Sequence, residues 1–415
     1  MSTQRAARRT TVNPGRRAAA EALLAVESGE HVEDALARLA PSDGADRALA
    51  WNAALGVLRR RSALDDLIRQ AARRAVRTLD PAVLAVLRVG VFELRETRTP
   101  PHAAVDQAVE LARALKVGHA AGFVNAVLRN QHGFTPDPEA ALGHPAWLVH
   151  AWRARYGQEA ADAWMNANNL PAPIFLVAKE DAAGVSRAFQ HAGVALGATA
   201  EGVFRVPEGA GRPEEWPGYA EGRWWIMDPA AVAVADLLGP VDGLRVLDAC
   251  AAPGGKTFRL ASRGAEVLAT DVDERRLERL GDGARRLGVA LSVRAVDWAQ
   301  AGATVDGAFD AAIVDAPCSG LGTLRRHPDA RWRRRPEDLV ANADRQRAIL
   351  HAVARAVRPG GAIVYAVCSP EPAEGVEVAR SLGWPIEAVF DNAPSPDGAD
   401  VFWAARMRAP AGPPA

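Results

Sequence analysis

Hydrophobic residues recur at three- and four-residue spacing from Gly15 to about Asn130, and segments of alternating polarity are almost absent there. This period is that of amphipathic helices, so the pattern predicts an all-α domain. Asp80 followed by Pro81 predicts a helix start, because aspartate caps a first turn and proline is tolerated at the first helical position. A proline-containing break at residues 134–139 ends this domain, which we place at residues 1–135.

The next part of the chain, residues 136–235, mixes helical and strand patterns. The stretch Pro145–Ala167 predicts one or two linker helices. Three short apolar runs predict strands: Ile174–Val177, Val203–Val206 and Trp224–Met227. We therefore expect a small α+β module that helps to position a substrate.

From Leu237 onward, strand and helix patterns alternate, which is the order of a parallel, doubly wound sheet. The expected strands are Arg245–Leu247, Val267–Thr270, Leu291–Ala295, Ala311–Val314 and Ala362–Val367. The fold class is thus multidomain, with an α/β Rossmann-like domain at residues 236–415.

Composition restricts the class of protein further. At 415 residues with 49% apolar content, the chain can form two or three domains. Its three cysteines, Cys250, Cys318 and Cys368, fit neither a disulfide scaffold nor a paired CxxC zinc site, and we expect no metal. Residues 1–17 lack the apolar core of a secretory signal, and no run of 18 apolar residues exists. We expect a cytoplasmic protein without membrane contact.

The formal net charge is +0, so any nucleic-acid binding must come from local patches. Arginines gather in two places: Arg5, Arg8, Arg9, Arg16 and Arg17 in the N-terminal tail, and Arg325, Arg326, Arg331, Arg333, Arg334 and Arg335 further on. For the tail, a solvated surface and RNA contact remain equal alternatives. The second run directly follows a cysteine segment, which favours phosphate contact.

A glycine-rich turn follows the strand that ends at Asp248 and leads into a helix. Such a strand-turn-helix is typical of a nucleotide-cofactor site. Asp271 ends the next strand, where an acid binds ribose hydroxyls, and Asp297 ends the third, where a carboxylate can meet an adenine edge. For any one of these aspartates alone, a role as a cap or turn former is the safer interpretation, and it is the pattern of three that favours a cofactor site. The turn has neither G-x-G-x-x-G nor Walker A spacing, which favours S-adenosylmethionine over NAD or ATP.

Cys318 and Cys368 each follow a strand-like apolar run and precede a serine. If the two strands are neighbours, both thiols lie in one site beside the cofactor. Carbon 5 of a pyrimidine becomes nucleophilic only after a thiolate adds at carbon 6, so the pair indicates pyrimidine methylation. Lys256 could favour the thiolate, and Asp315 could bind N3 of cytosine or the amine of the cofactor. We interpret Cys250 as a small buried hydrophobe whose backbone contacts the cofactor.

Three segments resemble one family closely: Asp248–Thr257, Asp315–Thr323 with Arg326–Asp329, and Pro359–Gly361 leading to Cys368-Ser369. They are similar to the RNA cytosine-5 methyltransferases of the Sun and Nop2 type. The segments Pro101–Val109 and Phe123–Arg129 resemble the RNA-binding NusB-type helical fold. Together these likenesses cover nearly the whole chain and imply the bacterial subgroup that methylates one cytosine of small-subunit (16S) ribosomal RNA.

The resemblance also implies residue roles. The cysteine matching Cys368 is the nucleophile that bonds to carbon 6, and the one matching Cys318 assists product release. Asp315 and Lys256 complete the catalytic set. The implied cofactor contacts are Cys250, Ala251, Ala252, Pro253, Gly254, Gly255, Lys256, Asp271, Asp297 and Asp315. The implied partner is ribosomal RNA, naked or in a partly assembled subunit, and we expect a monomer.

Several positions depart from the family pattern. Two follow the second cysteine, where the usual apolar residue is Pro370 and the usual Glu-Asn pair reads Glu374-Gly375. Three lie in the small module, where an arginine, an asparagine and a glutamine are replaced by Leu176, Ala178 and Met227. Near the C-terminus, the usual Asp-Gly-Phe-Phe reads Ala399-Asp400-Val401-Phe402-Trp403.

Two further hypotheses remain. A ribosome-assembly or RNA-binding factor could keep this fold without catalysis, although the intact cysteines and cofactor turn argue against it. A small-molecule methyltransferase would leave both the cysteine pair and the arginine run unexplained.

Overall fold

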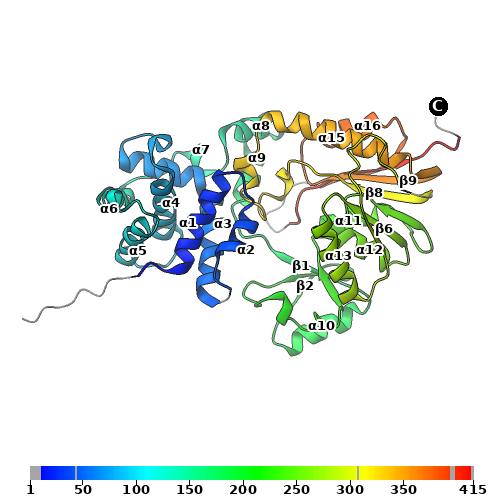
Figure 1. Ribbon diagram of the computed structural model, residues 1–415, viewed down its shortest axis with the longest axis horizontal. Coiled ribbons are helices and arrows are strands. Elements are labelled where there is room, and N and C mark those ends of the chain that lie inside the picture. Colours follow the sequence, from blue (N-terminus) through cyan, green and yellow to red (C-terminus); the bar gives the residue numbers. More distant parts are fainter. Residues whose placement is uncertain (1–10, 43, 306–307, 393–397, 413–415) are drawn as a thin grey trace, which may run out of the picture. The chain divides into compact units, whose positions relative to one another are not determined.

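The computed structural model describes residues 11–42, 44–305, 308–392 and 398–412 (Figure 1). The chain divides into two compact units. The first comprises Met1–Pro171 and Leu324–Arg334, and the second comprises Ala172–Thr323 and Arg335–Ala415. Within the described residues, no helix is both long enough and apolar enough to cross a membrane.

The first unit is helical, as its periodicity predicted. Its α-helices are α1 (Pro14–Glu27), α2 (Val32–Leu39), α3 (Gly44–Ala72), α4 (Pro81–Glu96), α5 (Pro101–Ala114), α6 (Ala121–Asn130), α7 (Pro138–Ala141), α8 (Ala146–Tyr156), α9 (Gln158–Ala167) and α14 (Ala330–Arg333). Short 3-10 turns lie at Val76–Thr78, Gly118–Ala120 and Gln131–Gly133. The predicted start of α4 is confirmed, because an Asp80 side-chain oxygen accepts hydrogen bonds from the amides of Ala82 and Val83 at 2.8 and 3.3 Å.

The core of this first unit forms where α3 and α4 pack closely together. A Cβ atom at Gly56 on α3 would lie 2.1 Å from the Phe92 ring on α4, so only glycine permits this approach. Val57, Val86 and Leu87 are fully buried in the same core. Burial of these side chains stabilises the helical unit by about 1.5–3 kcal/mol each before the cost of ordering the chain.

The second unit begins with a four-stranded antiparallel sheet in the order β2-β3-β1-β4. Its elements are β1 (Ile174–Ala178), α10 (Ala182–His191), β2 (Gly197–Ala200), β3 (Val203–Val206), the 3-10 turn Pro213–Glu215 and β4 (Trp224–Ile226). Leu176 and Ala178 are buried against Phe189 and Trp224 in the interior of this module. These two departures from the family pattern are therefore core residues.

The rest of the second unit is a seven-stranded sheet in the order β10-β11-β9-β8-β5-β6-β7. Its strands are β5 (Arg245–Asp248), β6 (Glu266–Asp271), β7 (Ser292–Ala295), β8 (Phe309–Asp315), β9 (Val357–Val367), β10 (Ile386–Asp391) and β11 (Trp403–Arg408). Strands β5 to β9 pair in parallel, whereas β10 and β11 pair antiparallel at one edge. The Rossmann-like fold class predicted from the alternating pattern is confirmed.

Helices cover both faces of this sheet (Figure 1). They are α11 (Pro229–Asp236), α12 (Gly255–Ala261), α13 (Glu274–Leu287), α15 (Pro336–Ala354) and α16 (Val376–Ser381), with a 3-10 turn at Leu321–Thr323. Alternate strand residues enter opposite layers, so Val246 packs with α11 to α13 and Leu247 packs with α15 and α16. This two-sided burial explains why the central strands are continuous apolar runs.

The strand order brings the two cysteine segments together. β8 and β9 are adjacent and parallel, with Asp315 paired to Ala366. The segments that follow β8 and β9 both leave the sheet at its carboxyl edge, where ligands bind in such sheets. Cys318 and Cys368 therefore begin neighbouring turns.

Candidate active site

The sulfur atoms of Cys318 and Cys368 lie 3.3 Å apart, and both residues are half-buried. The proximity predicted from neighbouring strands is thus confirmed. This separation is too long for a disulfide bond, which is about 2.05 Å, and suits a hydrogen bond between the two sulfurs.

The two thiols are not equivalent. The hydrogen bond to Cys368, burial, and the nearby charges of Cys368, Glu374 and Asp315 raise the pKa of Cys318 well above its ordinary value. A raised pKa favours the protonated form of Cys318, and either sulfur can be the donor in the hydrogen bond between the two.

Lys256 supplies positive charge beside this pair. Its Nζ atom donates to Asp315 Oδ2 at 2.6 Å and lies 5.0 Å from the centroid of the Phe402 ring. Burial opposes the charge, but Asp315 outweighs it, with further support from Asp248 and Cys368, so the pKa of Lys256 is raised. The ammonium therefore stays charged beside the thiol pair.

Burial and hydrogen bonding distinguish the strand-end acids of the predicted cofactor turn. Asp248 is buried, and one of its oxygens accepts from the Thr257 hydroxyl at 2.7 Å. Its other oxygen has no partner among the described residues, and burial raises the pKa of this carboxyl to about 7. The oxygens of Asp271 accept from the amides of Ala252 and Asp273 at 3.2 and 3.1 Å.

The remaining predicted cofactor residues follow from the same turn. Gly254 has φ +113°, and a Cβ atom there would lie 2.6 Å from the Phe258 ring, so this position requires glycine. Burial raises the pKa of the Cys250 thiol, which fits its interpretation as an inert residue. Asp297 is half-buried and accepts from its own turn at Ala299 N, 3.0 Å away. The unsatisfied Asp248 oxygen and the spare lone pairs of Asp271 fit the hydroxyl and amine donors of S-adenosylmethionine.

The arginine run after Cys318 does not form a single phosphate-binding surface. Arg331 is fully buried in the first unit and donates to Asn169 Oδ1 at 2.8 Å and to the carbonyls of Gly143 and Leu324 at 3.0 Å. Burial lowers its pKa to about 9. Phosphate contact is therefore wrong for Arg331 and stays a prediction for exposed members such as Arg335.

The N-terminal arginines are only partly described. Arg5, Arg8 and Arg9 lie outside the described residues. Arg16 pairs with Glu93 and Arg17 with Glu21, both at 2.8 Å. These two side chains are therefore already engaged within the helical unit.

The sequence pattern singled out Glu374 only as part of a family pair and assigned it no role, whereas the structure places it behind the two cysteines. Glu374 is fully buried and accepts hydrogen bonds from the hydroxyls of Ser319 and Ser369, both at 2.5 Å. Each serine directly follows one of the cysteines. The available signal was this repeated Cys-Ser pair together with an acid five residues after the second serine.

Two departures from the family pattern contact each other. A Cβ atom at Gly375 would lie 3.0–3.2 Å from three atoms of the Trp403 ring. The glycine that replaces the usual asparagine therefore makes room for the tryptophan that replaces the usual phenylalanine. Gly375 and Trp403 thus pack against each other beside Glu374.

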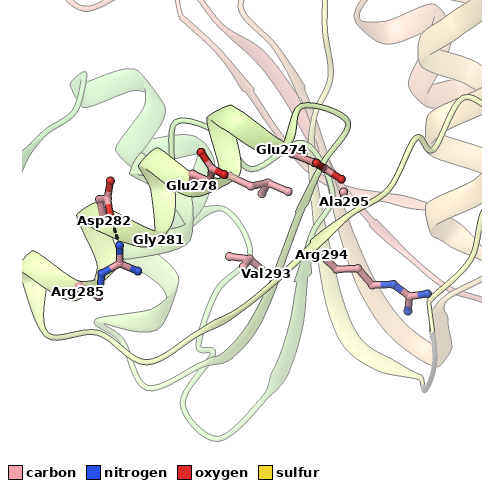
Figure 2. A pocket seen from close by; sticks show the side chains of 9 residues that line it. Glu274, Glu278, Gly281, Asp282, Arg285, Val293, Arg294 and Ala295 are labelled. Atoms are coloured by element: carbon pink, nitrogen blue, oxygen red, sulfur yellow. Dashed lines mark hydrogen bonds and ion pairs between the residues drawn. The ribbon is translucent and has the colours of Figure 1, made fainter.

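A separate open pocket lies along α13 and β7 (Figure 2). Glu274 and Glu278 contribute carboxylates to it, and Asp282 pairs with Arg285 within it. None of its lining residues is among the predicted catalytic or cofactor residues. We assign it no role in the chemistry.

Comparisons with known proteins agree with this site. The family model described as 16S rRNA methyltransferase RsmB/F matches residues 235–383, and the NusB family model matches residues 13–132. A ribosomal RNA small subunit methyltransferase B from Pseudomonas putida is 36% identical, covering 97% of this chain and 94% of its own length. A putative methyltransferase from Mycobacterium tuberculosis is also 36% identical, covering 90% of this chain and 87% of its own length.

Solved structures support the fold. The crystal structure of PH0851 matches with a TM-score of 0.79 at 21% identity, covering 96% of this chain and 99% of that chain. A methyltransferase homologue from Pyrococcus horikoshii matches with a TM-score of 0.54 at 23% identity, covering 65% of this chain and 96% of that chain.

The Rossmann-like sheet, its cofactor turn and the family model define a methyltransferase that uses S-adenosylmethionine. Because a curated relative is 36% identical over nearly the full length of both sequences, the chain belongs to the RsmB/F family of 16S rRNA methyltransferases. The family resemblance, the fold class and the cofactor predicted from the sequence are confirmed.

Proposed function

We propose that this protein methylates carbon 5 of a cytosine in small-subunit ribosomal RNA through a covalent bond between Cys368 and carbon 6. The observation that carries this proposal is the 3.3 Å separation of two sulfurs at the carboxyl edge of a methyltransferase sheet. A small-molecule methyltransferase has no need for the second thiol.

The residues act in sequence. The Cys368 thiolate, stabilised by Lys256, adds to carbon 6 and pushes the electrons of the 5,6 double bond toward carbon 5. When bound, S-adenosylmethionine supplies the electrophilic methyl group. Asp315 is held as a hydrogen-bond acceptor by the Lys256 ammonium and can accept from the exocyclic amine of the cytosine. Cytosine is thereby favoured over uracil, which has a carbonyl at this place.

Product release uses the second thiol. The strongest influence raising the pKa of Cys318 is its hydrogen bond to Cys368. Once Cys368 is bonded to carbon 6, this hydrogen bond no longer raises the pKa of Cys318, and Cys318 can lose its proton to solvent. Its thiolate then takes the proton from carbon 5, the carbon–sulfur bond breaks, and Cys368 leaves as the thiolate.

The parts of the chain divide the work in this proposal. Residues 1–135 bind RNA, residues 136–235 position it, and residues 236–415 carry the chemistry. The enzyme works as a cytoplasmic monomer, on naked RNA or on a partly assembled subunit. The matches to the NusB and RsmB/F family models support the first and third of these assignments.

The test is transfer of labelled methyl from S-adenosylmethionine to unmodified small-subunit RNA, supplied naked and as assembly intermediates. We expect 5-methylcytosine at one site, no label with Cys368→Ala, and protein trapped covalently on RNA with Cys318→Ala. Cys250→Ala is the matched control and should keep turnover. Full turnover by Cys368→Ala, or a trapped adduct with the cysteine roles exchanged, would contradict the mechanism. No label from the wild type on either substrate would favour the non-catalytic assembly factor.

A further inference from the structure

Glu374 connects the two turns that carry the reactive thiols. Its Oε2 atom accepts from the hydroxyls of Ser319 and Ser369, and its Oε1 atom accepts from the Ser319 amide at 2.7 Å. Ser319 and Ser369 are separated by 50 residues, and each directly follows a cysteine in the sequence. One carboxylate thus binds both Cys-Ser segments.

Backbone groups hold these segments only in part: β9 pairs with β11 as far as Val367, and Gly322 N donates to Cys368 O at 3.0 Å. The ladder between β8 and β9 ends at the Asp315–Ala366 pair, before either cysteine is reached. Beyond it, the Gln346 side chain donates to Pro317 O at 3.0 Å and to Glu374 Oε1 at 3.3 Å. Cys318 is therefore anchored through the residues on both sides of it.

The surroundings of Glu374 are unusual for a buried acid. Asn342, which lies on α15 with Gln346, donates to Oε1 at 3.0 Å. All the side chains that donate to this carboxylate within the described residues are neutral. A buried carboxylate is costly unless it is fully hydrogen-bonded, and neutral donors leave its negative charge acting on nearby groups.

We propose that Glu374 is a positioning residue for methyl transfer, which holds the two sulfurs at their working separation and places a fixed negative charge behind them. This inference rests on the proposed function of Cys318 and Cys368. Glu374 is among the groups that raise the pKa of Cys318. This charge therefore disfavours a thiolate on Cys318.

Two variants separate the geometric and electrostatic parts of this role. Glu374→Asp keeps the charge but is one methylene shorter, so it cannot reach both serines. We expect its kcat to fall about 100-fold, as for a misplacement of about 1 Å, with little change in KM for S-adenosylmethionine. Glu374→Gln keeps the length but removes the charge, so Cys318 should react with iodoacetamide at lower pH than in the wild type.

The measurements are kcat and KM for methyl transfer, and the pH dependence of alkylation at each cysteine, followed by peptide mass spectrometry. Glu377→Gln makes the same chemical change at an exposed site on α16 and is the matched control. It should match the wild type in both measurements. If Glu374→Gln fails to fold, Ser319→Ala and Ser369→Ala replace it, and each should lower kcat while remaining folded.

Wild-type kcat in both Glu374 variants, or in both serine variants, would overturn the inference. So would a Cys318 alkylation profile in Glu374→Gln identical to that of the wild type. The alkylation experiment needs no RNA, so it separates this inference from the proposed function. Absence of methyl transfer by the wild-type protein would count against the function alone.

Discussion

Gly375→Ala is the smallest change that tests the packing behind the active site. The added Cβ atom would lie 3.0 Å from Cδ2, 3.1 Å from Cγ and 3.2 Å from Cε3 of Trp403. Trp403 pairs with Val367 across the sheet, directly before Cys368, and Gly375 directly follows Glu374. A displaced indole therefore disturbs both the nucleophile and the residue proposed to position it.

The magnitude follows from these distances. Carbon atoms in comfortable contact lie about 3.5–4.0 Å apart, so the ring must move by roughly 0.5 Å. Overpacking of this kind costs about 1–3 kcal/mol. A displacement of this size next to the reactive thiol should also lower kcat by roughly 10-fold.

A double-mutant cycle with Trp403→Phe isolates the contact. The smaller ring lacks the fused-ring atoms and can tilt away. Trp403→Phe alone should therefore lower the free energy of unfolding by about 1 kcal/mol, yet in the double variant it should relieve the clash. We expect the double variant to be more stable than the sum of the single changes predicts by at least about 0.5 kcal/mol. Urea denaturation followed by far-UV circular dichroism measures all four corners without relying on tryptophan fluorescence.

Strict additivity of the two changes would refute this reasoning. So would a Gly375→Ala variant as stable as the wild type, because the ring would then have moved at no cost. Gly383→Ala is not a suitable control, since its φ of +70° already favours glycine. Gly281→Ala on α13 is suitable, because the nearest atom to its Cβ is the end of a flexible arginine at 3.6 Å.

Two further predictions concern titration and oxidation. Because burial raises the pKa of Asp248 from about 3.9 in an unfolded chain to about 7, the native state binds its proton more tightly than the unfolded chain does. As pH rises from about 4 to 7, the free energy of unfolding of the wild type should therefore fall by up to roughly 4 kcal/mol relative to that of Asp248→Asn. Urea denaturation at several pH values measures this difference, and a difference that does not change with pH would contradict the prediction. Diamide should accept two protons and two electrons from Cys318 and Cys368 and leave a disulfide that dithiothreitol reverses, whereas Cys250 should remain a free thiol that is alkylated after denaturation; mass spectrometry of the linked peptides decides.

The sequence by itself determined the chemistry-bearing segments. Apolar runs that end in Asp248, Asp315 and Cys368 indicated buried parallel strands, because such strands are covered on both faces. The Rossmann-like class, the cofactor and the proximity of the cysteines all followed from those strand ends. The strands β2, β10 and β11 were not predicted. Gly197–Ala200 is exposed throughout and Ile386–Asp391 is mostly exposed, so β2 and β10 carry no strong alternation of buried side chains.

Only the tertiary structure decided which polar residues are buried and what they bind. Arg331 reads in the sequence as one member of a basic run, yet packing encloses it with Asn169 and several carbonyls. Glu374 reads as an ordinary acid, yet it binds two serines from turns that follow different strands. Local patterns encode the period of an element, whereas the partner of a buried charge is set by chain segments far apart in sequence that meet only in the fold.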